Sequence, residues 1–266
     1  MNGPDTHDCL TIWTNNTRLA THASTAGVDR IGVDLEVYDK AARQAGHETW
    51  ISPHRLSDLL ELRDKIGNAR LFARCNPLSE GSNDEIEAVL DAGTEIIMVP
   101  NFTRIEQVES FVRMVDGRAL VVPLVERVSA IDTIPEFRGL GLSEFHVGLN
   151  DLSIELGIAN RLRLLTLPLA DRIAELAMSS GLSFGMGGLA RVGDHGLRVP
   201  ADLVHARYVQ LGASKALIAR SFRADKLDQP ALCREISTLR QKLADWRGVN
   251  PDVLDGARDQ LHKATQ

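Results

Sequence analysis

The sequence predicts an α/β protein of the (β/α)8 TIM-barrel class with one extra C-terminal helix. Short apolar runs alternate with amphipathic helical patterns, and such alternation indicates a sheet of parallel strands. About eight strand–helix units fit into the 266 residues, which is the size of one barrel. A doubly wound open sheet is the alternative, but its glycine-rich phosphate turn should follow the first strand. Here the first strand runs into "TNNTRL" at 14–19 instead.

The predicted strands are short apolar runs, most of them followed by a helical pattern. In chain order they are "LTIW" (10–13), "RIGVDL" (30–35), "ARLFAR" (69–74), "EIIMVP" (95–100), "RALVVPLV" (118–125), "EFHVGL" (144–149), "LSFGMG" (182–187) and "KALIAR" (215–220). Glycines close several of the intervening helices just before the next strand, which is typical of helix C-termini.

Two of these helices carry clear end signals. "NDEIEAVLDAG" (83–93) ends on a glycine, and "TRIEQVESFVRMVDG" (103–117) has Thr103 as its predicted N-cap and also ends on a glycine. No internal repeat and no Pro/Gly/Ser-rich linker divides the chain. We therefore expect one barrel domain over 1–266.

Two further helices, at 229–246 and 251–264, follow the last strand, and the ring of barrel helices is complete without the second. The second helix has a one-sided apolar stripe, which must be buried somewhere. The stripe consists of Val253, Leu254, Ala257 and Leu261. We expect a neighbouring subunit to cover it, so that 227–266 lies in the contacts of a homo-oligomer. The alternative is that this helix folds back onto the bottom face of its own barrel.

Composition excludes several classes of function. The formal net charge is -6 and there is no basic run, which argues against a nucleic-acid partner. No apolar stretch has the length of a membrane span, and the first ten residues lack the regions of a signal peptide. Three scattered cysteines (Cys9, Cys75 and Cys233) indicate reduced thiols and a cytoplasmic protein, with no disulfide framework and no zinc site.

Residue parity predicts which side chains enter the barrel lumen, because alternate strand residues face opposite sides. In the second strand Ile31, Val33 and Leu35 should face the helices. The inward residues would then be Gly32, Asp34, Glu36, Phe72, Arg74, Asn76, Val122, Leu124, Glu126, His146 and Gly148, with Asp151 just beyond its strand. The charged members Glu36, Arg74, Glu126 and Asp151 should therefore meet at the C-terminal rim, where barrel enzymes keep their chemistry.

Three carboxylates and one arginine leave a surplus of negative charge at this rim. Close carboxylates either take up protons or attract a cation, and an all-oxygen site suits a hard divalent ion. We expect Glu126 and Asp151 to bind Mg²⁺ or Mn²⁺, with Glu36 reaching the water ligands of the ion. Arg74 would then be free to hold a substrate carboxylate in a two-pronged hydrogen bond. The alternative is that Glu126 forms a structural ion pair with Arg74 or Arg127.

A second anion pocket is predicted after the seventh strand, where "GMGGLARVG" (185–193) is rich in glycine. Glycine lets backbone N–H groups approach an anion, and barrels often bind phosphate at this position. The residues of this pocket would be Gly187, Gly188, Arg191 and Arg220. The alternative is a tight turn with solvated arginines. Lys40 and Arg43, after the second strand, would add positive charge for a polyanionic substrate such as a citrate-like acid.

Five segments occur in an order that is similar to a known family. They are "RIGVDLEVYDKAARQ" (30–44), "FARCNPL" (72–78), "GTEIIMVPNF" (93–102), "PLVERVSAI" (123–131) and "FHVGLNDLSIELG" (145–157). Together they resemble the HpcH/HpaI aldolase and citrate lyase beta-subunit family, over about 27–220.

The resemblance implies a barrel that binds magnesium or manganese and makes or breaks carbon–carbon bonds beside a carboxylate-bearing carbonyl. By motif, Glu126 and Asp151 match the metal-binding carboxylates of the family, and Arg74 matches its substrate-binding arginine. Glu36 matches the acidic residue after the second strand. The family's barrels often exchange a C-terminal helix in dimers that stack into hexamers, which agrees with the oligomer expected above.

Two departures from the family's pattern narrow the interpretation. Pyruvate aldolases of the family usually carry a histidine where this chain has Val37, so their base is missing from its place. "VPNF" (99–102) replaces the lysine-bearing end of strand four that is common in the citrate lyase branch, which weakens a coenzyme A assignment. What remains is a metal-dependent aldolase or synthase for small keto acids.

We therefore expect a carbon–carbon lyase that acts on a 2-keto acid such as pyruvate or oxaloacetate through an enolate stabilised by the metal ion. Gly148 and Asn150 would contribute to substrate binding. The group that moves the proton would be His146 in the lumen, or His47 or His54 in the loop after strand two. The alternatives are a citrate-lyase-like acyl-CoA lyase, a phosphoenolpyruvate-using enzyme on the same barrel, and a non-catalytic binding barrel.

Overall fold

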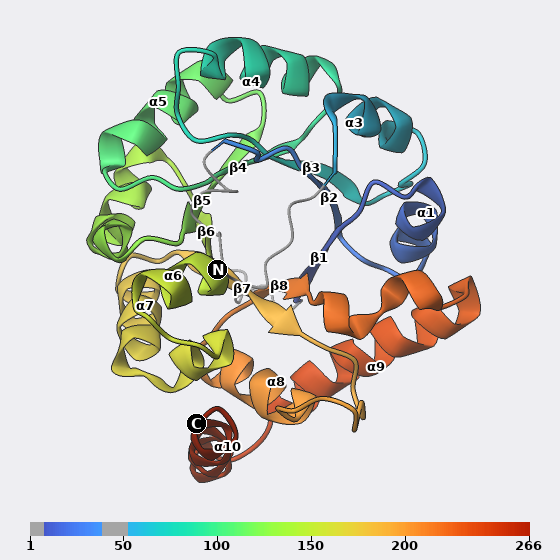
Figure 1. The fold of residues 1–266 in the computed structure, drawn as a ribbon, viewed down its shortest axis with the longest axis vertical. Helices are drawn as coiled ribbons and strands as arrows, with labels where there is room; N and C mark the ends of the chain where they lie inside the picture. Colours follow the sequence, from blue (N-terminus) through green and yellow to red (C-terminus); the bar gives the residue numbers. More distant parts are fainter. Residues whose placement is uncertain (1–7, 39–52) are drawn as a thin grey trace, which may run out of the picture.

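The protein is a closed barrel of eight parallel strands, each paired with its neighbours in sequence order. The computed structural model describes residues 8–38 and 53–266. Figure 1 looks into the barrel and shows the strands in the centre with the helices around them. The strands are β1 (Cys9–Trp13), β2 (Arg30–Asp34), β3 (Arg70–Arg74), β4 (Ile96–Val99), β5 (Leu120–Val125), β6 (Glu144–Val147), β7 (Ser183–Leu189) and β8 (Lys215–Ile218). The predicted fold class is confirmed.

Helices cover the outside of the barrel. The α-helices of the described part are α1 (Thr17–Thr25), α3 (Leu56–Arg63), α4 (Ser82–Asp91), α5 (Ile105–Val115), α6 (Leu149–Glu155), α7 (Pro168–Ser179), α8 (Ala201–Gln210), α9 (Gln229–Arg247) and α10 (Pro251–Ala264). The 3-10 helices are η1 (Val128–Leu140), η2 (Arg161–Thr166), η3 (Arg220–Phe222) and η4 (Ala224–Lys226). The element after β5 is thus a 3-10 helix, with Pro135 inside it.

Two sequence predictions about local structure need correction. Thr103 is not the N-cap of α5, because that position falls on Arg104 and the Gln107 side chain accepts hydrogen bonds from both backbone N–H groups. The seventh strand does not end at Gly187, because β7 continues through Gly188 to Leu189 and its register shifts there as in a β-bulge. A strand rich in glycine is a poor match to the usual strand composition, so sequence patterns end it too early.

The core has an inner and an outer layer, as residue parity predicts. Phe72, Ile96, Met98, Val122 and Leu124 form a separate cluster inside the lumen. The alternate residues of β2 and its C-terminal extension belong to the larger cluster between strands and helices, and these are Ile31, Val33 and Leu35. Strand alternation therefore also fixes the direction of the polar side chains at the strand ends.

A buried ion pair closes the amino-terminal end of the lumen. The guanidinium group of Arg30, at the start of β2, donates two hydrogen bonds of 2.5 and 2.9 Å to the carboxylate of Glu144, at the start of β6. Lys215 Nζ lies 3.9 Å from the same carboxylate. β2 and β6 are not neighbours in the barrel, so this contact spans the lumen.

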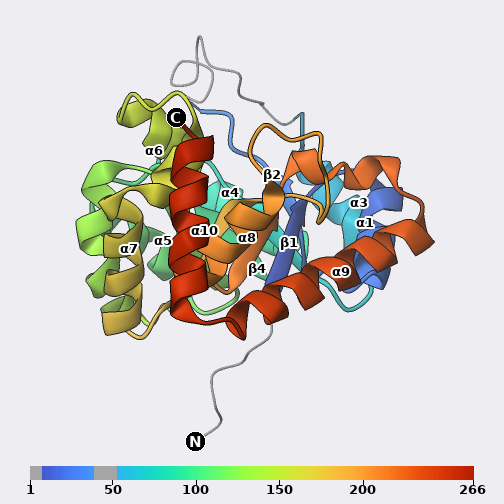
Figure 2. The same cartoon turned by 90° about the horizontal axis from the view of Figure 1, so that it is seen from below.

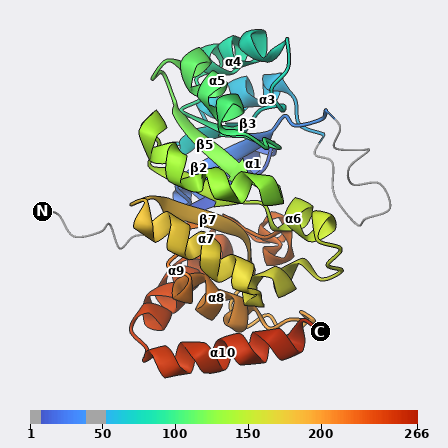
Figure 3. The same cartoon turned by 90° about the vertical axis from the view of Figure 1, so that its left-hand side faces the viewer.

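Helix α10 packs on its own chain, against α8 and η2 on the flank of the barrel. Figures 2 and 3 show it as an outer layer beside α8. Ala257 and Leu261 are buried in this contact, whereas Val253 is 51% exposed. The expectation that the whole stripe needs a neighbouring subunit was therefore wrong for Ala257 and Leu261. Neither does the helix lie on the bottom face. The homo-oligomer stays a prediction.

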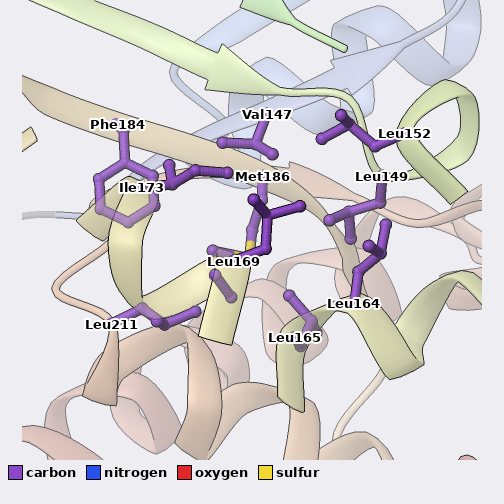
Figure 4. A pocket seen from close by; sticks show the side chains of 11 residues that line it. Val147, Leu149, Leu152, Leu164, Leu165, Leu169, Ile173, Phe184, Met186 and Leu211 are labelled. Atoms are coloured by element: carbon purple, nitrogen blue, oxygen red, sulfur yellow. The ribbon is translucent and has the colours of Figure 1, made fainter. Parts of the chain in front are cut away.

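A small apolar void lies between β6, β7 and α7. Its volume is about 20 Å³, and Figure 4 shows the side chains that point into it. The lining is apolar throughout: Val147, Leu149, Leu152, Leu164, Leu165, Leu169, Ala170, Ile173, Phe184, Met186 and Leu211. A water molecule there would find no polar partner, so the void is a dry packing defect.

Two findings bear on the environment of the protein. None of the helices in residues 8–38 and 53–266 has the length and hydropathy needed to cross a membrane. The three cysteines are all free, which confirms the expectation of unpaired thiols.

Candidate active site

The C-terminal rim of the barrel brings together the charged residues that parity predicts. Glu36 follows β2, Arg74 ends β3, Glu126 follows β5 directly, and Asp151 lies in the first turn of α6. The three carboxylates are buried, with Glu36 and Glu126 each only 1% exposed. Arg74 Nη1 lies 3.4 Å from Glu36 Oε2, and Glu126 interacts electrostatically with Glu36, Arg74 and Asp151.

Asp34 is a fourth carboxylate of this rim, and it changes the role expected of Arg74. The Nε and Nη2 atoms of Arg74 donate hydrogen bonds of 2.8 and 2.7 Å to the two carboxylate oxygens of Asp34. The expectation that Arg74 is free for a two-pronged substrate contact was wrong. Asp34 and Arg74 are direct partners in the β2–β3 register, so their side chains meet on the inner face. The remaining guanidinium nitrogen, Nη1, is directed toward Glu36 rather than toward Asp34.

The pKa of Arg74 is nevertheless raised. Burial by itself lowers it, and the charge and hydrogen bonds of Asp34, followed by the charges of Glu36 and Glu126, outweigh burial. The guanidinium also lies over the ring of Trp13, 5.8 Å from the ring centroid. Arg74 is therefore a permanent, well-held positive charge among the four carboxylates.

Glu126 sits in the environment that most disfavours an ionised carboxylate. Burial raises its pKa to about 8, together with the negative charges of Glu36 and Asp151, although Arg74 and a backbone hydrogen bond oppose the rise. That hydrogen bond comes from the N–H of Asn101, 2.8 Å from Glu126 Oε1. Without an added cation this carboxyl group holds a proton at pH 7.

The backbone around Glu126 is shaped to admit its side chain. Asn101 has φ +47°, in the left-handed region that asparagine tolerates better than most residues, and this turn aims its N–H at Glu126. Gly148 lies against Glu126 so closely that a Cβ on Gly148 would fall 2.4 Å from Glu126 Cβ. Gly148 is thus required to make room for the carboxylate. Asn150, the other residue expected near the substrate here, is exposed.

Asn76 holds the chain segment that carries Glu36. Its side-chain oxygen accepts hydrogen bonds from the N–H groups of Val37 (2.8 Å) and Tyr38 (3.0 Å). The Glu85 carboxylate accepts in turn from the Asn76 side chain, at 2.8 Å. Asn101, Asn76 and the pairing of Asp34 escaped the sequence analysis. Two features of the sequence could have indicated these roles. Asp34 and Asn76 occupy positions that strand parity directs toward the lumen, and asparagine tolerates the left-handed backbone conformation found at Asn101.

The histidines differ in how they relate to the rim. His146 is buried in the lumen near Phe72, its Nε2 has no hydrogen-bond partner in the described part, and burial lowers its pKa to about 4. It lies one inward position below Gly148 on its strand. His54 accepts a hydrogen bond at Nδ1 from the backbone N–H of Asp34, at 2.9 Å, which brings it to the end of β2. His47 lies outside the described residues.

The residues expected in the second anion pocket divide into two groups. Gly188 lines a cavity at the ends of β7 and β8, whereas Arg191 points to Asp194, with 3.9 Å between Nη2 and Oδ2. Arg220 begins the 3-10 helix after β8 and interacts electrostatically with Arg161, Asp34 and Arg74. Gly187 packs beside Leu217 of β8. The predicted contributions of Lys40 and Arg43 lie outside the described residues.

The carboxylates of the rim have the donor chemistry that a hard divalent cation prefers. Glu126 and Asp151 offer oxygen ligands only, and among the described residues the four rim carboxylates outnumber the two arginines, Arg74 and Arg220. No group of three or more His, Cys, Asp or Glu side chains in the described ranges is arranged so that it could hold a metal ion. Magnesium sites of this kind are completed by water and substrate, so two protein carboxylates suffice.

Comparisons with known proteins support the fold and no more. No known protein family matches the chain, and neither does any curated protein. Among solved structures, an HpcH/HpaI aldolase from Desulfitobacterium hafniense DCB-2 superposes with a TM-score of 0.60 at 16% identity, covering 92% of this chain and 96% of that one. RipC from Yersinia pestis gives 0.57 at 17% identity, with 94% and 100% covered.

A barrel of different chemistry is equally similar. The 3-keto-L-gulonate-6-phosphate decarboxylase from Vibrio cholerae O1 superposes with a TM-score of 0.58 at 18% identity, covering 90% of this chain and 99% of that one. Similar values for an aldolase and a decarboxylase mean that the overall fold does not select a reaction. An argument for function has to come from the site.

Proposed function

We propose that the protein is a lyase or aldolase that makes or breaks a carbon–carbon bond in a small 2-keto acid, such as pyruvate or oxaloacetate, with Mg²⁺ or Mn²⁺ bound at the rim. The observation that carries the proposal is the surplus of buried negative charge at the C-terminal end of the lumen. Among the described residues, four carboxylates (Asp34, Glu36, Glu126 and Asp151) gather there around Arg74, and Arg220 is the second arginine nearby. A structural role alone would favour a balanced set of charges.

Glu126 and Asp151 are the proposed ligands of the cation. When bound, the cation supplies positive charge that stabilises the negative charge developing on the keto oxygen. Glu126, with its pKa of about 8, would have to release its proton to hold the cation. Gly148 keeps the space open beside Glu126, and Asn101 holds one carboxylate oxygen in place.

Arg74 is proposed to attract the substrate carboxylate through the Nη1 side of its guanidinium. Its other side is held by Asp34, so the group is oriented before substrate arrives. Glu36, 3.4 Å from Nη1, competes for the same hydrogen-bond donor and would be displaced or bridged when a substrate binds. Arg74 thus contributes one directed contact rather than a two-pronged one.

A hydrogen bond to the reacting substrate is assigned to His54 in preference to His146. A pKa of about 4 makes His146 a weak base at neutral pH, and it lies below the rim. His54 uses Nδ1 to accept from the Asp34 backbone, which leaves the proton of the neutral ring on Nε2. In that tautomer His54 would donate a hydrogen bond from Nε2–H to a substrate oxygen, and it would not give up that proton. Val37, at the position where pyruvate aldolases of the resembled family usually carry a histidine, has an apolar side chain that can neither donate nor accept a hydrogen bond.

The experiment that tests the proposal combines metal binding with turnover. Mg²⁺ and Mn²⁺ are titrated by calorimetry into the wild type, Glu126→Gln and Asp151→Asn, and keto-acid donors are screened with aldehyde and keto-acid acceptors by mass spectrometry. We expect both variants to lose metal binding and activity while they remain folded. The matched control is Glu155→Gln on α6, the helix of Asp151. Its exposed carboxylate faces Arg127 and accepts a hydrogen bond from the N–H of Val128. Unchanged metal affinity in both rim variants would contradict the proposal.

The same screen separates the alternatives. An acyl-CoA lyase would consume thioesters, and a phosphoenolpyruvate-using enzyme would accept phosphoenolpyruvate in place of pyruvate or oxaloacetate. A non-catalytic barrel would turn over none of these and would show no binding of either metal ion.

A further inference from the structure

A second cavity opens at the C-terminal end of the barrel, beside the carboxylate-rich rim. It has a volume of about 340 Å³ and lies between η2, the ends of β7 and β8, and the first turn of α8. Polar and charged lining comes from Asn160, Arg161, Arg198 and Ser221. The described residues that line the cavity include no aspartate or glutamate.

The two arginines of this cavity lack counter-ions. Within residues 8–38 and 53–266 neither Arg161 nor Arg198 forms an ion pair or a side-chain hydrogen bond, whereas many other arginines of the protein do. Arg30 and Arg207 are examples, with partners at Glu144 and Asp171. Two positive charges at one cavity without an acidic residue repel each other, so an anionic ligand would relieve the repulsion.

A third arginine, Arg220, extends the positive charge of this cavity toward the carboxylate-rich rim. Arg220 lies between the two, because its electrostatic partners are Arg161, Asp34 and Arg74. Burial and the positive charges of Arg161 and Arg74 keep the pKa of Arg220 below its usual value, against the pull of Asp34. A substrate with an anionic group at each end would follow this line from the cavity to Arg74.

The backbone at the cavity is also suited to an anion. Gly188 has φ +110°, a conformation that side-chain-bearing residues rarely adopt, and it lies in the irregular part of β7. Helix α8 starts at the cavity without a side-chain cap. Its first-turn carboxylate, Asp202, is turned away to Trp246 Nε1 (3.1 Å) and Lys242 Nζ (2.8 Å). The positive end of the helix dipole is therefore not neutralised on the cavity side.

We infer that this cavity binds a phosphate group of the substrate through the guanidinium groups of Arg161 and Arg198. A phosphate monoester carries nearly two negative charges at neutral pH and offers three acceptor oxygens, which matches two uncompensated guanidinium groups. A carboxylate would neutralise only one of them. The inference rests on the proposed function only in assigning this phosphate to the same substrate that reaches Arg74; the binding site itself is tested without turnover.

The test is a calorimetric titration of inorganic phosphate into the full-length protein without divalent cations. Wild type is compared with Arg161→Gln and Arg198→Gln, and acetate is titrated as the carboxylate probe. The matched control is Arg113→Gln, which removes the same charge from exposed α5, where Arg113 pairs only with Glu109 and Ser110. Each cavity substitution should weaken phosphate binding by about tenfold to 100-fold, the range for a hydrogen bond between charged groups. The control should bind like the wild type.

Three results would overturn the inference: no phosphate binding by the wild type, equal affinity in the cavity variants, or acetate binding more tightly than phosphate. The last would make the cavity a carboxylate site. Glu126→Gln separates this inference from the proposed function, because the variant should lose metal binding and keep its phosphate affinity. Phosphate binding without keto-acid turnover would leave the cavity assignment standing and remove only the proposed reaction.

Discussion

The two ends of the barrel lumen are built from similar groups and balanced in opposite ways. At the amino-terminal end the buried carboxylate of Glu144 faces Arg30 and Lys215. At the C-terminal rim, among the described residues, four buried carboxylates lie near two arginines, Arg74 and Arg220. Counting these groups, the amino-terminal end is neutral or slightly positive, whereas the C-terminal rim has a surplus of negative charge.

The difference is expressed in the pKa values of the two glutamates. Burial alone would raise both. For Glu144 the hydrogen bonds and charge of Arg30, with the charges of His146 and Lys215, outweigh burial and lower the pKa. For Glu126 the neighbouring Glu36 and Asp151 add to burial, and the pKa rises to about 8. Burial of a charged group therefore indicates function only where its counter-charges are missing.

The largest effect on stability is expected from removing the Arg30–Glu144 ion pair at the amino-terminal end of the lumen. Arg30→Met leaves Glu144 buried with only the more distant Lys215, and should lower the free energy of unfolding by about 3–5 kcal/mol. The double variant Arg30→Met/Glu144→Leu should recover most of that loss. Urea unfolding monitored by circular dichroism measures both. Arg113→Met, which breaks an exposed pair with Glu109, is the control, and a loss as small as in that variant would show that the Arg30 pair has no structural role.

The surplus of negative charge at the C-terminal rim should instead be detectable in how the free energy of unfolding depends on pH. The folded-state pKa of Glu126 is raised from 4.5 to about 8. Between these values the folded state binds the extra proton, so the contribution of Glu126 to stability is full below pH 4.5 and is lost as pH rises towards 8. The slope is at most about 1.4 kcal/mol per pH unit. Unfolding in urea from pH 4 to 9 should show this decline in the wild type and not in Glu126→Gln.

Glu144 provides the opposite sign within the same lumen. Because its folded-state pKa is lowered, its contribution is present above the unfolded-state pKa and is lost as pH falls below it. Replacing Glu144 should therefore alter the acid side of the stability profile. A Glu126→Gln profile with the same slope as the wild type between pH 4.5 and 8 would contradict the comparison.

The link between Asp34 and Arg74 should affect catalysis more than stability. Lysine cannot form the planar two-pronged contact with Asp34, so Arg74→Lys should reduce kcat/KM of the proposed reaction by about tenfold to 100-fold. Asp34→Asn should reproduce much of this loss, because it weakens the hold on Arg74 without touching the guanidinium. Steady-state kinetics of both variants on the best substrate pair makes the measurement. Wild-type kinetics in Arg74→Lys would show that Arg74 serves only as an ion-pair partner.

The smallest effect comes from a buried region without charge. Val147→Ile adds one methylene group next to the 20 Å³ void shown in Figure 4 and should stabilise the fold by about 0.8 kcal/mol or less. Val125 is its register partner on β5, is fully buried and does not line the void. Val125→Ile should therefore destabilise the fold through overpacking. Equal changes in thermal stability for the two variants would contradict the assignment of the void.

The sequence by itself determined the order of strands and helices and the direction of the strand residues. Both depend on local periodicity, since apolar runs and helical patterns alternate and strand side chains alternate every residue. Glu36, Arg74 and Glu126 were therefore predicted at one rim without knowledge of the contacts between strands. Asp151 followed because it comes just after the end of β6.

Only the tertiary structure decided which of these groups pair. The Asp34–Arg74 contact depends on the register between β2 and β3, and the Arg30–Glu144 contact on the closure of the barrel across the lumen. Arg161 and Arg198 line the same cavity although they are 37 positions apart in the chain. Helix α10 packs against α8 on the flank of its own barrel. Such contacts join residues that no local period relates, so they are fixed by packing and charge in the folded chain rather than by sequence spacing.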